Sequence, residues 1–210
     1  QIKQLEVYTN EEERKRLILV ASSPRNGLTT TLYSLTSMHD PYHNNIITLE
    51  NIIESELEGV THTTIKNEPD SPGTGRQFTS IVRRDPEVAL FSLIKESEEA
   101  KAIANAAAWR SGRPFTLAGI HATTALQAVQ KWGQLVQDSD KAFDGLRGIL
   151  VQRSIRTLCT ACKKAYKPGP NLAKSGLPLD GADTLFKAGG EIEKKNIAGT
   201  KIIKCAFCEG

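Results

Sequence analysis

The sequence predicts an α/β fold with a mainly parallel sheet, followed by a small C-terminal subdomain that holds a metal. Three observations lead to this prediction. Short apolar runs alternate with segments of helical period along residues 17–150, as in sheets whose strands are joined by helices. One of those runs leads into a turn-rich loop and a Thr-led segment, over residues 17–33. Four cysteines fall as two pairs near the C-terminus.

Hydrophobic periodicity places each element. We expect strands at residues 17–21, 46–49, 60–65, 88–93 and 115–120. We expect helices at residues 29–38, 77–84, 96–109, 125–136 and 140–150, and one more after Asn10. Asn10 and Asp140 are residue types that cap helix N-termini. Beyond Cys159 the sequence is rich in Lys, Pro and Gly, so we place a boundary near Leu150, between residues 1–150 and 151–210.

Composition and charge exclude several classes of protein. The net charge of +3 is too mild to indicate a nucleic-acid partner. No apolar run approaches the roughly 20 residues of a membrane-spanning helix, and no signal-peptide pattern opens the chain, so we expect no membrane insertion. The chain begins with Gln1 rather than Met, which predicts a piece of a longer protein. Cysteines in two local pairs favour a reducing compartment over a disulfide-stapled secreted domain.

Residues 17–33 have the strand, loop and helix context of a phosphate-binding loop. The Walker A pattern GxxxxGK[ST] would place its glycines at Ser22 and Gly27, its lysine at Leu28 and its magnesium-binding hydroxyl at Thr29. The candidate cofactor-binding residues are Ser22, Ser23, Pro24, Arg25, Asn26, Gly27, Leu28, Thr29 and Thr30. Leucine in place of lysine removes a charge-assisted contact worth about 1.5–3 kcal/mol. Arg25 offers charge with a different geometry. The alternative is a plain strand-to-helix turn.

The cysteines form two Cys-x-x-Cys pairs, Cys159 with Cys162 and Cys205 with Cys208. Four soft ligands in this arrangement predict a tetrahedral zinc site. Such a site is structural, because four protein ligands leave no open position for catalysis. The alternatives are unliganded thiols or a redox pair, although nothing around them indicates a thioredoxin-like unit.

Four single residues are candidates for chemistry. Glu50 and Glu54 follow a predicted strand, where carboxylates can reach the ligand crevice of an α/β sheet. His121 ends another strand, and Arg83 ends a helix. Each also has a plainer explanation: solvated carboxylates, a structural histidine, and an arginine that caps helix carbonyls.

The order of these motifs resembles the type II secretion and type IV pilus assembly ATPase family, general secretion pathway protein E and its relatives. The most specific piece is residues 151–163, VQRSIRTLCTACK, similar to the family's AQRLVRTLCPxCK. Residues 17–33 are similar to LILVTGPTGSGKTTTLY, and residues 47–54 to the Asp box ITIEDPIE. Residues 82–87 are similar to LRQDPD, and residues 120–122 to the LHT of the His box.

The resemblance implies a RecA-like P-loop core with a helical, zinc-binding C-terminal subdomain. It implies a cytoplasmic hexamer, peripheral at the inner membrane, with nucleotide between subunits and with the platform proteins of a secretion or pilus complex as partners. Catalytic roles for Glu50, Glu54, Arg83 and His121 are implied in the same way.

The departures from the family's motifs fall on its chemistry. Asn51 replaces the aspartate of the Asp box, Thr79 replaces an arginine, and Leu93 stands where Walker B has its acid. Without the lysine and the acid, phosphoryl transfer should be severely slowed. We therefore expect ATP and magnesium to bind weakly or not at all, and the chain to be a structural or regulatory partner in a homo- or hetero-oligomer.

Three other functions stay open at this point. The chain could be an active ATPase in which Arg25, with Glu96 or Glu54, covers the missing roles. It could be a nucleic-acid binder that uses the zinc module as a ribbon, although aromatic residues are few. It could also be an assembly scaffold whose only ligand is zinc.

Overall fold

The computed structural model of this chain describes residues 17–108, 114–167, 184–189, 191–196 and 199–208. The chain divides into two compact units, of which the first ends at Ser154 and the second begins at Ile155. The helix predicted after Asn10 and the last residue of the one predicted at 96–109 lie outside the described residues. Among the helices that are described, none combines the length and the apolar character needed to cross a bilayer.

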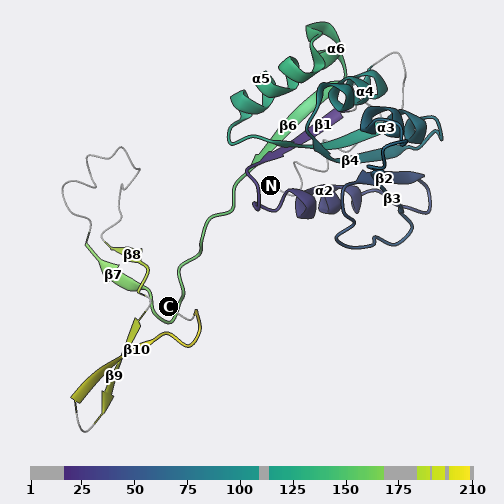
Figure 1. Ribbon diagram of the computed structural model, residues 1–210. Helices are drawn as coiled ribbons and strands as arrows, with labels where there is room; N and C mark the ends of the chain where they lie inside the picture. The colour runs from purple at the N-terminus through teal and green to yellow at the C-terminus, as the bar shows by residue number, and fades with distance from the viewer. Residues whose placement is uncertain (1–16, 109–113, 168–183, 190, 197–198, 209–210) are drawn as a thin grey trace. The chain divides into compact units, whose positions relative to one another are not determined.

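The first unit is built on a six-stranded sheet in the order β3-β2-β4-β5-β1-β6, in which every neighbouring pair runs parallel (Figure 1). The strands are β1 (Leu17–Ser22), β2 (Ile46–Glu50), β3 (Thr61–Thr64), β4 (Val88–Ile94), β5 (Phe115–His121) and β6 (Leu146–Gln152). The predicted α/β fold with a parallel sheet is confirmed. Since the strands are parallel, the residues that follow them gather at one edge of the sheet, where ligands bind in such folds.

Helices cover both faces of the sheet (Figure 1). They are α2 (Leu28–Thr36) on one face, and α3 (Thr74–Val82), α4 (Ser97–Ala107), α5 (Ala125–Val136) and the short α6 (Ser139–Asp144) on the other. Successive residues of β1 alternate between the two layers. Leu19 packs in the cluster that holds Trp132 of α5, and Val20 packs in the cluster that holds Leu32 of α2. Burial on both faces explains why residues 17–21 of this strand are all apolar.

The helix predicted at residues 140–150 is wrong. The short α6 ends at Asp144, and the following residues form β6, which pairs with β1. Its N-cap is Asp138, not Asp140. At Gly145, between the two elements, an added Cβ would lie 2.2 Å from the carbonyl oxygen of Ala107. The apolar spacing fits a helix and a strand about equally, and pairing with the sheet decides between them.

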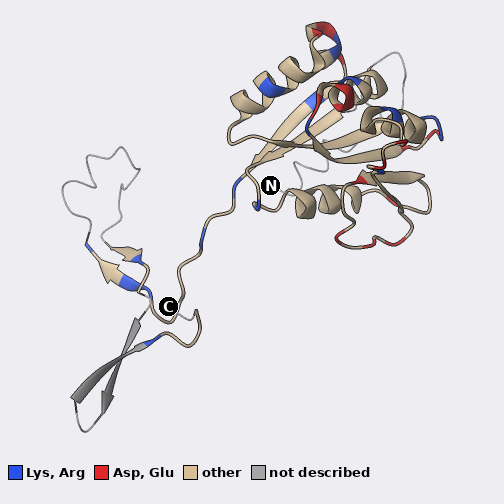
Figure 2. Cartoon of the chain, viewed as in Figure 1, with Lys and Arg blue, Asp and Glu red and all other residues tan. Residues whose placement is uncertain are grey.

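The second unit contains two small antiparallel pairs. One joins β7 (Lys164–Tyr166) to β8 (Leu185–Lys187), and the other joins β9 (Glu191–Asn196) to β10 (Gly199–Lys204). No helix occurs among its described residues, where the resemblance had implied a helical subdomain. Over residues 155–167, 184–189 and 204–208 all charged residues are Lys or Arg (Figure 2). A divalent cation held by four thiolates forms a site with a net negative charge, and these positive side chains would offset it.

Candidate functional site

The loop between β1 and α2 is shaped by two residues with left-handed backbone. Gly27, the N-cap of α2, has a φ of 76°, and Arg25 has a φ of 61°. Glycine adopts this conformation freely, whereas another residue gives up about 1–2 kcal/mol to do so. Within the described structure, no side chain caps the N-terminus of α2. The N–H groups of its first turn therefore point from a helix N-terminus, an arrangement that favours an anion.

A pocket of about 460 Å³ lies beside this loop, and we call it the loop pocket. Its lining residues come from the loop, the start of α2, the segment after β2, β4 and the end of β5: Arg25, Gly27, Leu28, Thr29, Thr30, Asn51, Ile52, Glu54, Ser92, Leu93 and His121. The predicted cofactor-binding residues Ser22, Ser23, Pro24 and Asn26 do not line it. Two of the predicted catalytic residues, Glu54 and His121, do line it, and Glu50 and Arg83 do not.

Two aliphatic side chains lie on the wall of the loop pocket. Leu28 is half-buried and packs against the core cluster on its side of the sheet. Gly119 leaves room for it, because a Cβ there would lie 3.1 Å from Leu28 Cδ2. Leu93, near the end of β4, lines the same pocket. Phosphoryl transfer in P-loop proteins uses a lysine on the phosphates and an acid that holds magnesium, and neither leucine can supply these groups.

Polar groups hold the rest of the pocket wall in place. The Nδ1–H of His121 donates a hydrogen bond to the carbonyl oxygen of Ser22 at 3.1 Å, because a carbonyl can only accept. In the neutral imidazole, Nε2 then carries the lone pair. The backbone N–H of Asn51 donates to Ser92 Oγ at 3.2 Å. This bond attaches the segment after β2 to the end of β4.

Glu50 is fully buried in a polar network instead of lining the pocket. Its carboxylate accepts hydrogen bonds from Tyr33 Oη at 2.5 Å, Thr48 Oγ1 at 2.6 Å and His62 Nδ1 at 2.8 Å. The tautomer of His62 follows from its other nitrogen, because Nε2 accepts the N–H of Leu57 at 3.0 Å. Three donors on one buried carboxylate satisfy its need for hydrogen bonds. The network joins α2, β2 and β3 beside the loop pocket.

Tyr33 makes this network sensitive to alkaline pH. Burial, and then its hydrogen bond to Glu50, raise the pKa of Tyr33 to about 12. The unfolded chain would ionise this phenol near pH 10 and the folded chain would not. The contribution of Tyr33 to stability is therefore complete below about pH 10 and is lost as the pH rises through about 12.

We expect the free energy of unfolding of Tyr33→Phe to fall less steeply between about pH 10 and pH 12 than that of the wild type, since Phe has no phenol to ionise. Urea denaturation across this range measures the slope. Tyr42→Phe is the control, because Tyr42 is 84% exposed. Equal slopes in the wild type and in Tyr33→Phe would contradict the prediction.

Arg83 lies at the C-terminal end of α3, where its N–H bonds the carbonyl of Thr79. Glu96, the other acid considered for catalysis, is the N-cap of α4. It forms a capping box with Glu99, so its carboxylate is used by helix N–H groups. The structure therefore brings Arg25, Thr29, Glu54 and His121 together at the loop pocket, and keeps Arg83 and Glu96 out of its lining.

The four cysteines of the second unit lie together, with all their sulfur atoms within 4.8 Å of one another. Cys159 Sγ is 3.8 Å from Cys205 Sγ, and Cys162 Sγ is 3.6 Å from Cys208 Sγ. A tetrahedron with Zn–S bonds of about 2.3 Å has sulfurs about 3.8 Å apart, so the four thiols fit this metal. All four are free of disulfides. The predicted tetracysteine cluster is confirmed, and it is consistent with zinc.

Local backbone structure shapes this cluster. Cys159 and Lys163 are joined by a backbone hydrogen bond of 3.0 Å that closes a tight turn around the first pair. Gly189 passes against this turn so closely that an added Cβ would lie 1.8 Å from the carbonyl oxygen of Cys162. Hydrogen bonds from the backbone of Ala161 and then Cys162 lower the pKa of Cys159 to about 7. The thiolate, which is the form that binds metal, is thus favoured at this position.

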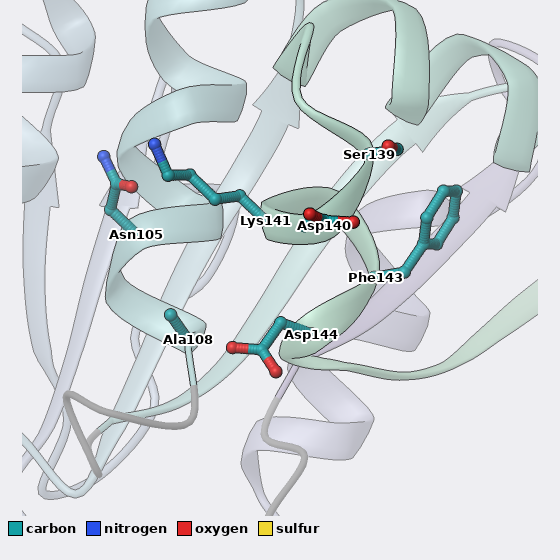
Figure 3. A pocket seen from close by; sticks show the side chains of 7 residues that line it. All are labelled: Asn105, Ala108, Ser139, Asp140, Lys141, Phe143 and Asp144. Carbon is teal, nitrogen blue, oxygen red and sulfur yellow. The ribbon is translucent and has the colours of Figure 1, made fainter.

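A second pocket, of about 780 Å³, lies between α4 and α6 (Figure 3). Its lining residues are Asn105, Ala108, Ser139, Asp140, Lys141, Phe143 and Asp144. It contains none of the predicted site residues, and its end at Ala108 adjoins residues outside the described part of the chain. The candidate functional sites are therefore the loop pocket and the cysteine cluster.

The sequence-based predictions omitted three side chains that support the loop and the pocket beside it: Tyr33, His62 and Gln152. Tyr33 reads as one more apolar residue of α2, and His62 as one residue of an alternating strand. A signal was present for His62, because parallel pairing sets it opposite Thr48, two residues before Glu50. Gln152 ends β6 opposite Ser22 of β1, and the wrong helix at residues 140–150 concealed that position.

Comparison with known proteins then identifies the family. A family model described as "Type II/IV secretion system protein" matches residues 3–207. The chain belongs to this family. It is 32% identical to the type II secretion system protein E of Dickeya dadantii over 183 residues, which are 87% of this chain and 36% of that protein. It is 26% identical to the type IV pilus assembly ATPase PilB of Thermus thermophilus over 194 residues, which are 92% of this chain and 20% of that protein.

Solved structures share the fold. The pilus retraction motor PilT with bound ADP aligns with a TM-score of 0.55 at 20% identity, over 73% of this chain and 46% of that one. The VirB11 ATPase of the Brucella suis type IV secretion system, in complex with sulphate, aligns with a TM-score of 0.50 at 22% identity, over 64% and 41%. The chain spans about a third of the length of its first curated relatives. The expected RecA-like core and the family resemblance are both confirmed.

Proposed function

We propose that this chain is part of a divergent motor protein of the secretion and pilus ATPase family, in which the loop pocket binds phosphate groups weakly and hydrolysis is weak or lost. The observation that carries the proposal is the presence of Leu28 and Leu93 on the same pocket as Thr29. The backbone of the loop and the N-terminus of α2 can still receive an anion. The two side chains that should hold phosphate and magnesium are aliphatic.

The proposed role is structural or regulatory, in the cytoplasm and peripheral at the inner membrane. The chain would assemble with itself or with an active relative into a hexameric ring that contacts the platform proteins of a secretion or pilus complex. Support comes from the family and from relatives such as the type II secretion system ATPase E of Vibrio cholerae, 30% identical over 151 residues. Zinc, held by Cys159, Cys162, Cys205 and Cys208, would give the second unit its fold, and no nucleic acid takes part.

Calorimetric titration with magnesium and ATP tests this proposal, with zinc measured on the same sample. We expect about one zinc per chain and an ATP dissociation constant in the millimolar range, which corresponds to about −4 kcal/mol. Co-purification with a platform protein or an active relative tests the assembly. Recovery of neither partner, together with no self-assembly, would contradict the proposed role.

An active ATP-hydrolysing motor with substituted catalytic residues is the second candidate. The observation in its favour is that Arg25 and Glu54 both line the loop pocket. Micromolar ATP affinity, with magnesium-dependent turnover that Thr29→Ala and Glu54→Gln each abolish, would establish this candidate and overturn the first.

Arg25→Gly removes both the charge and the left-handed strain at residue 25. The free energy of unfolding reports on the strain, and pyrophosphate affinity reports on the charge. Glycine relieves the left-handed conformation, so we expect the free energy of unfolding to stay the same or rise by up to about 1 kcal/mol. The lost charge should weaken pyrophosphate binding about twofold to fivefold, as for an exposed ion pair. Arg76→Ala removes the same charge at an exposed position outside the pocket. This control should leave pyrophosphate affinity unchanged. Equal pyrophosphate affinity in the wild type and in Arg25→Gly would show that Arg25 takes no part in binding the phosphate groups.

A further inference from the structure

The loop between β1 and α2, residues 23–27, is called the phosphate loop below. It is attached to the end of β6 and the residues that follow it, more than 120 residues away in sequence. Asn26 is the centre of this attachment. Its side-chain amide donates to the carbonyl oxygens of Pro24 at 3.0 Å and Ser23 at 3.4 Å, which closes the loop on itself. Its Oδ1 accepts the backbone N–H of Ser154 at 3.0 Å. One asparagine therefore joins the two arms of the loop to the last residue of the first unit.

Gln152 holds the same loop with both ends of its side-chain amide. Nε2 donates to the carbonyl oxygen of Asn26 at 2.7 Å. Oε1 accepts a hydrogen bond from the hydroxyl of Thr31, in the first turn of α2. These partners fix the orientation of the amide, because a carbonyl can only accept and the oxygen end must face the hydroxyl. Gln152 thus bridges the loop and the helix that follows it.

This bridge also sets the direction of a pocket donor. A trans peptide is planar, so the N–H of Gly27 points opposite to the carbonyl of Asn26. That carbonyl faces Gln152, so the N–H of Gly27 faces away from Gln152. Gly27 is one of the residues that line the loop pocket. Donors that are held in position before a ligand arrives bind it more tightly, because no ordering cost remains.

We propose that Gln152 and Ser154 form a latch that holds the phosphate loop in its anion-accepting shape and makes that shape depend on the segment leading to Cys159. Ser154 is followed directly by Ile155 of the second unit, and residues 153–158 are all exposed. Displacement of this segment withdraws the N–H of Ser154 from Asn26 and loosens the loop. Gln152 is a positioning residue in this proposal, which rests on the proposed function only for the identity of the ligand.

Hydrogen exchange without any ligand tests the latch itself. Gln152→Glu keeps the size and the acceptor for Thr31, but it replaces the donor to Asn26 with a carboxylate oxygen that repels the carbonyl. We expect exchange of the Thr31 amide, whose N–H donates to the carbonyl oxygen of Gly27 at 3.1 Å, to rise about tenfold, the effect of a lost net hydrogen bond or more. Gln127→Glu is the matched control, because Gln127 Oε1 accepts both hydrogen bonds from Thr123. Unchanged exchange in Gln152→Glu overturns the proposal.

Two variants of Ser154 test the link to the following segment. Ser154→Pro removes the N–H that Asn26 accepts, whereas Ser154→Ala keeps it. We expect faster exchange of the Thr31 amide, which donates to Gly27, in the proline variant only. Equal exchange in both variants would show that this segment does not control the loop.

Pyrophosphate titration separates the latch from the proposed function. We expect Gln152→Glu to weaken pyrophosphate binding about tenfold while its melting temperature stays close to that of Gln127→Glu, a pattern that a general loss of stability would not give. If the wild type binds no pyrophosphate but exchange responds as expected, the latch stands and the proposed ligand is wrong. If pyrophosphate binds equally to wild type and to Gln152→Glu, the positioning role is overturned.

Discussion

Cys162→Ser is expected to abolish zinc binding and unfold the second unit, while the first unit keeps its structure. The sulfur of Cys162 is buried and lies 3.6 Å from that of Cys208, so its loss opens the tetrahedron. Structural zinc in small modules has an apparent binding free energy of about 10–16 kcal/mol, and such modules are unfolded without it. The strand pairs of the second unit have two strands each, and isolated two-stranded pairs are marginal in water.

Elemental analysis of the purified chain measures the zinc, and amide hydrogen exchange reports on each unit separately. We expect about one zinc per chain in the wild type and almost none in Cys162→Ser, with full exchange at residues 159–167 and 204–208 and unchanged protection in β1 and β5. Thr160→Ala is the control, since Thr160 is exposed and lies between two ligands without being one. Protection of the second unit in a zinc-free sample would contradict the prediction.

Where local pattern and tertiary environment agree, the sequence was sufficient to predict the structure. The apolar run of β1 is buried on both faces, so its pattern and its environment demand the same residues. The limits of α5 match the prediction at both ends, because Thr124 caps its start through the N–H of Gln127 and Gln137 ends it in a left-handed conformation. Two Cys-x-x-Cys pairs most often bind one metal ion jointly. The structure brings the four sulfur atoms together as this requires.

Prediction failed where long-range contacts decide. Residues 146–152 form a strand because β1 offers them a partner, and no local pattern contains that information. The resemblance implied a catalytic role for Glu50, but its place in the network depends on Tyr33 and His62, which only the folded sheet brings to it. Gln152 and Asn26 meet across 126 residues. Side chains that shape a site from a distance in sequence are the ones that sequence motifs describe least well.

Leu28→Lys is expected to tighten pyrophosphate and ATP binding about tenfold to 150-fold. The lysine would place an ammonium at the start of α2, where a charge-assisted hydrogen bond to a phosphate is worth about 1.5–3 kcal/mol, and each 1.4 kcal/mol is a factor of ten. The cost in stability should be modest, because Leu28 is half-buried beside the pocket and a lysine stem can cover the same apolar surface while its head reaches solvent.

Calorimetry measures the gain, and Leu126→Lys is the matched control. Leu126 is 67% exposed in the first turn of α5. Its replacement by lysine adds the same charge at a position that does not line the loop pocket. Tighter binding in both variants would indicate non-specific attraction, and no gain in Leu28→Lys would show that the loop pocket is not a phosphate site. Hydrolysis requires a further step, since Leu93 offers no ligand to magnesium. We therefore expect turnover only after Leu93→Glu is added to Leu28→Lys, because phosphoryl transfer of the P-loop type needs both the lysine and the acid.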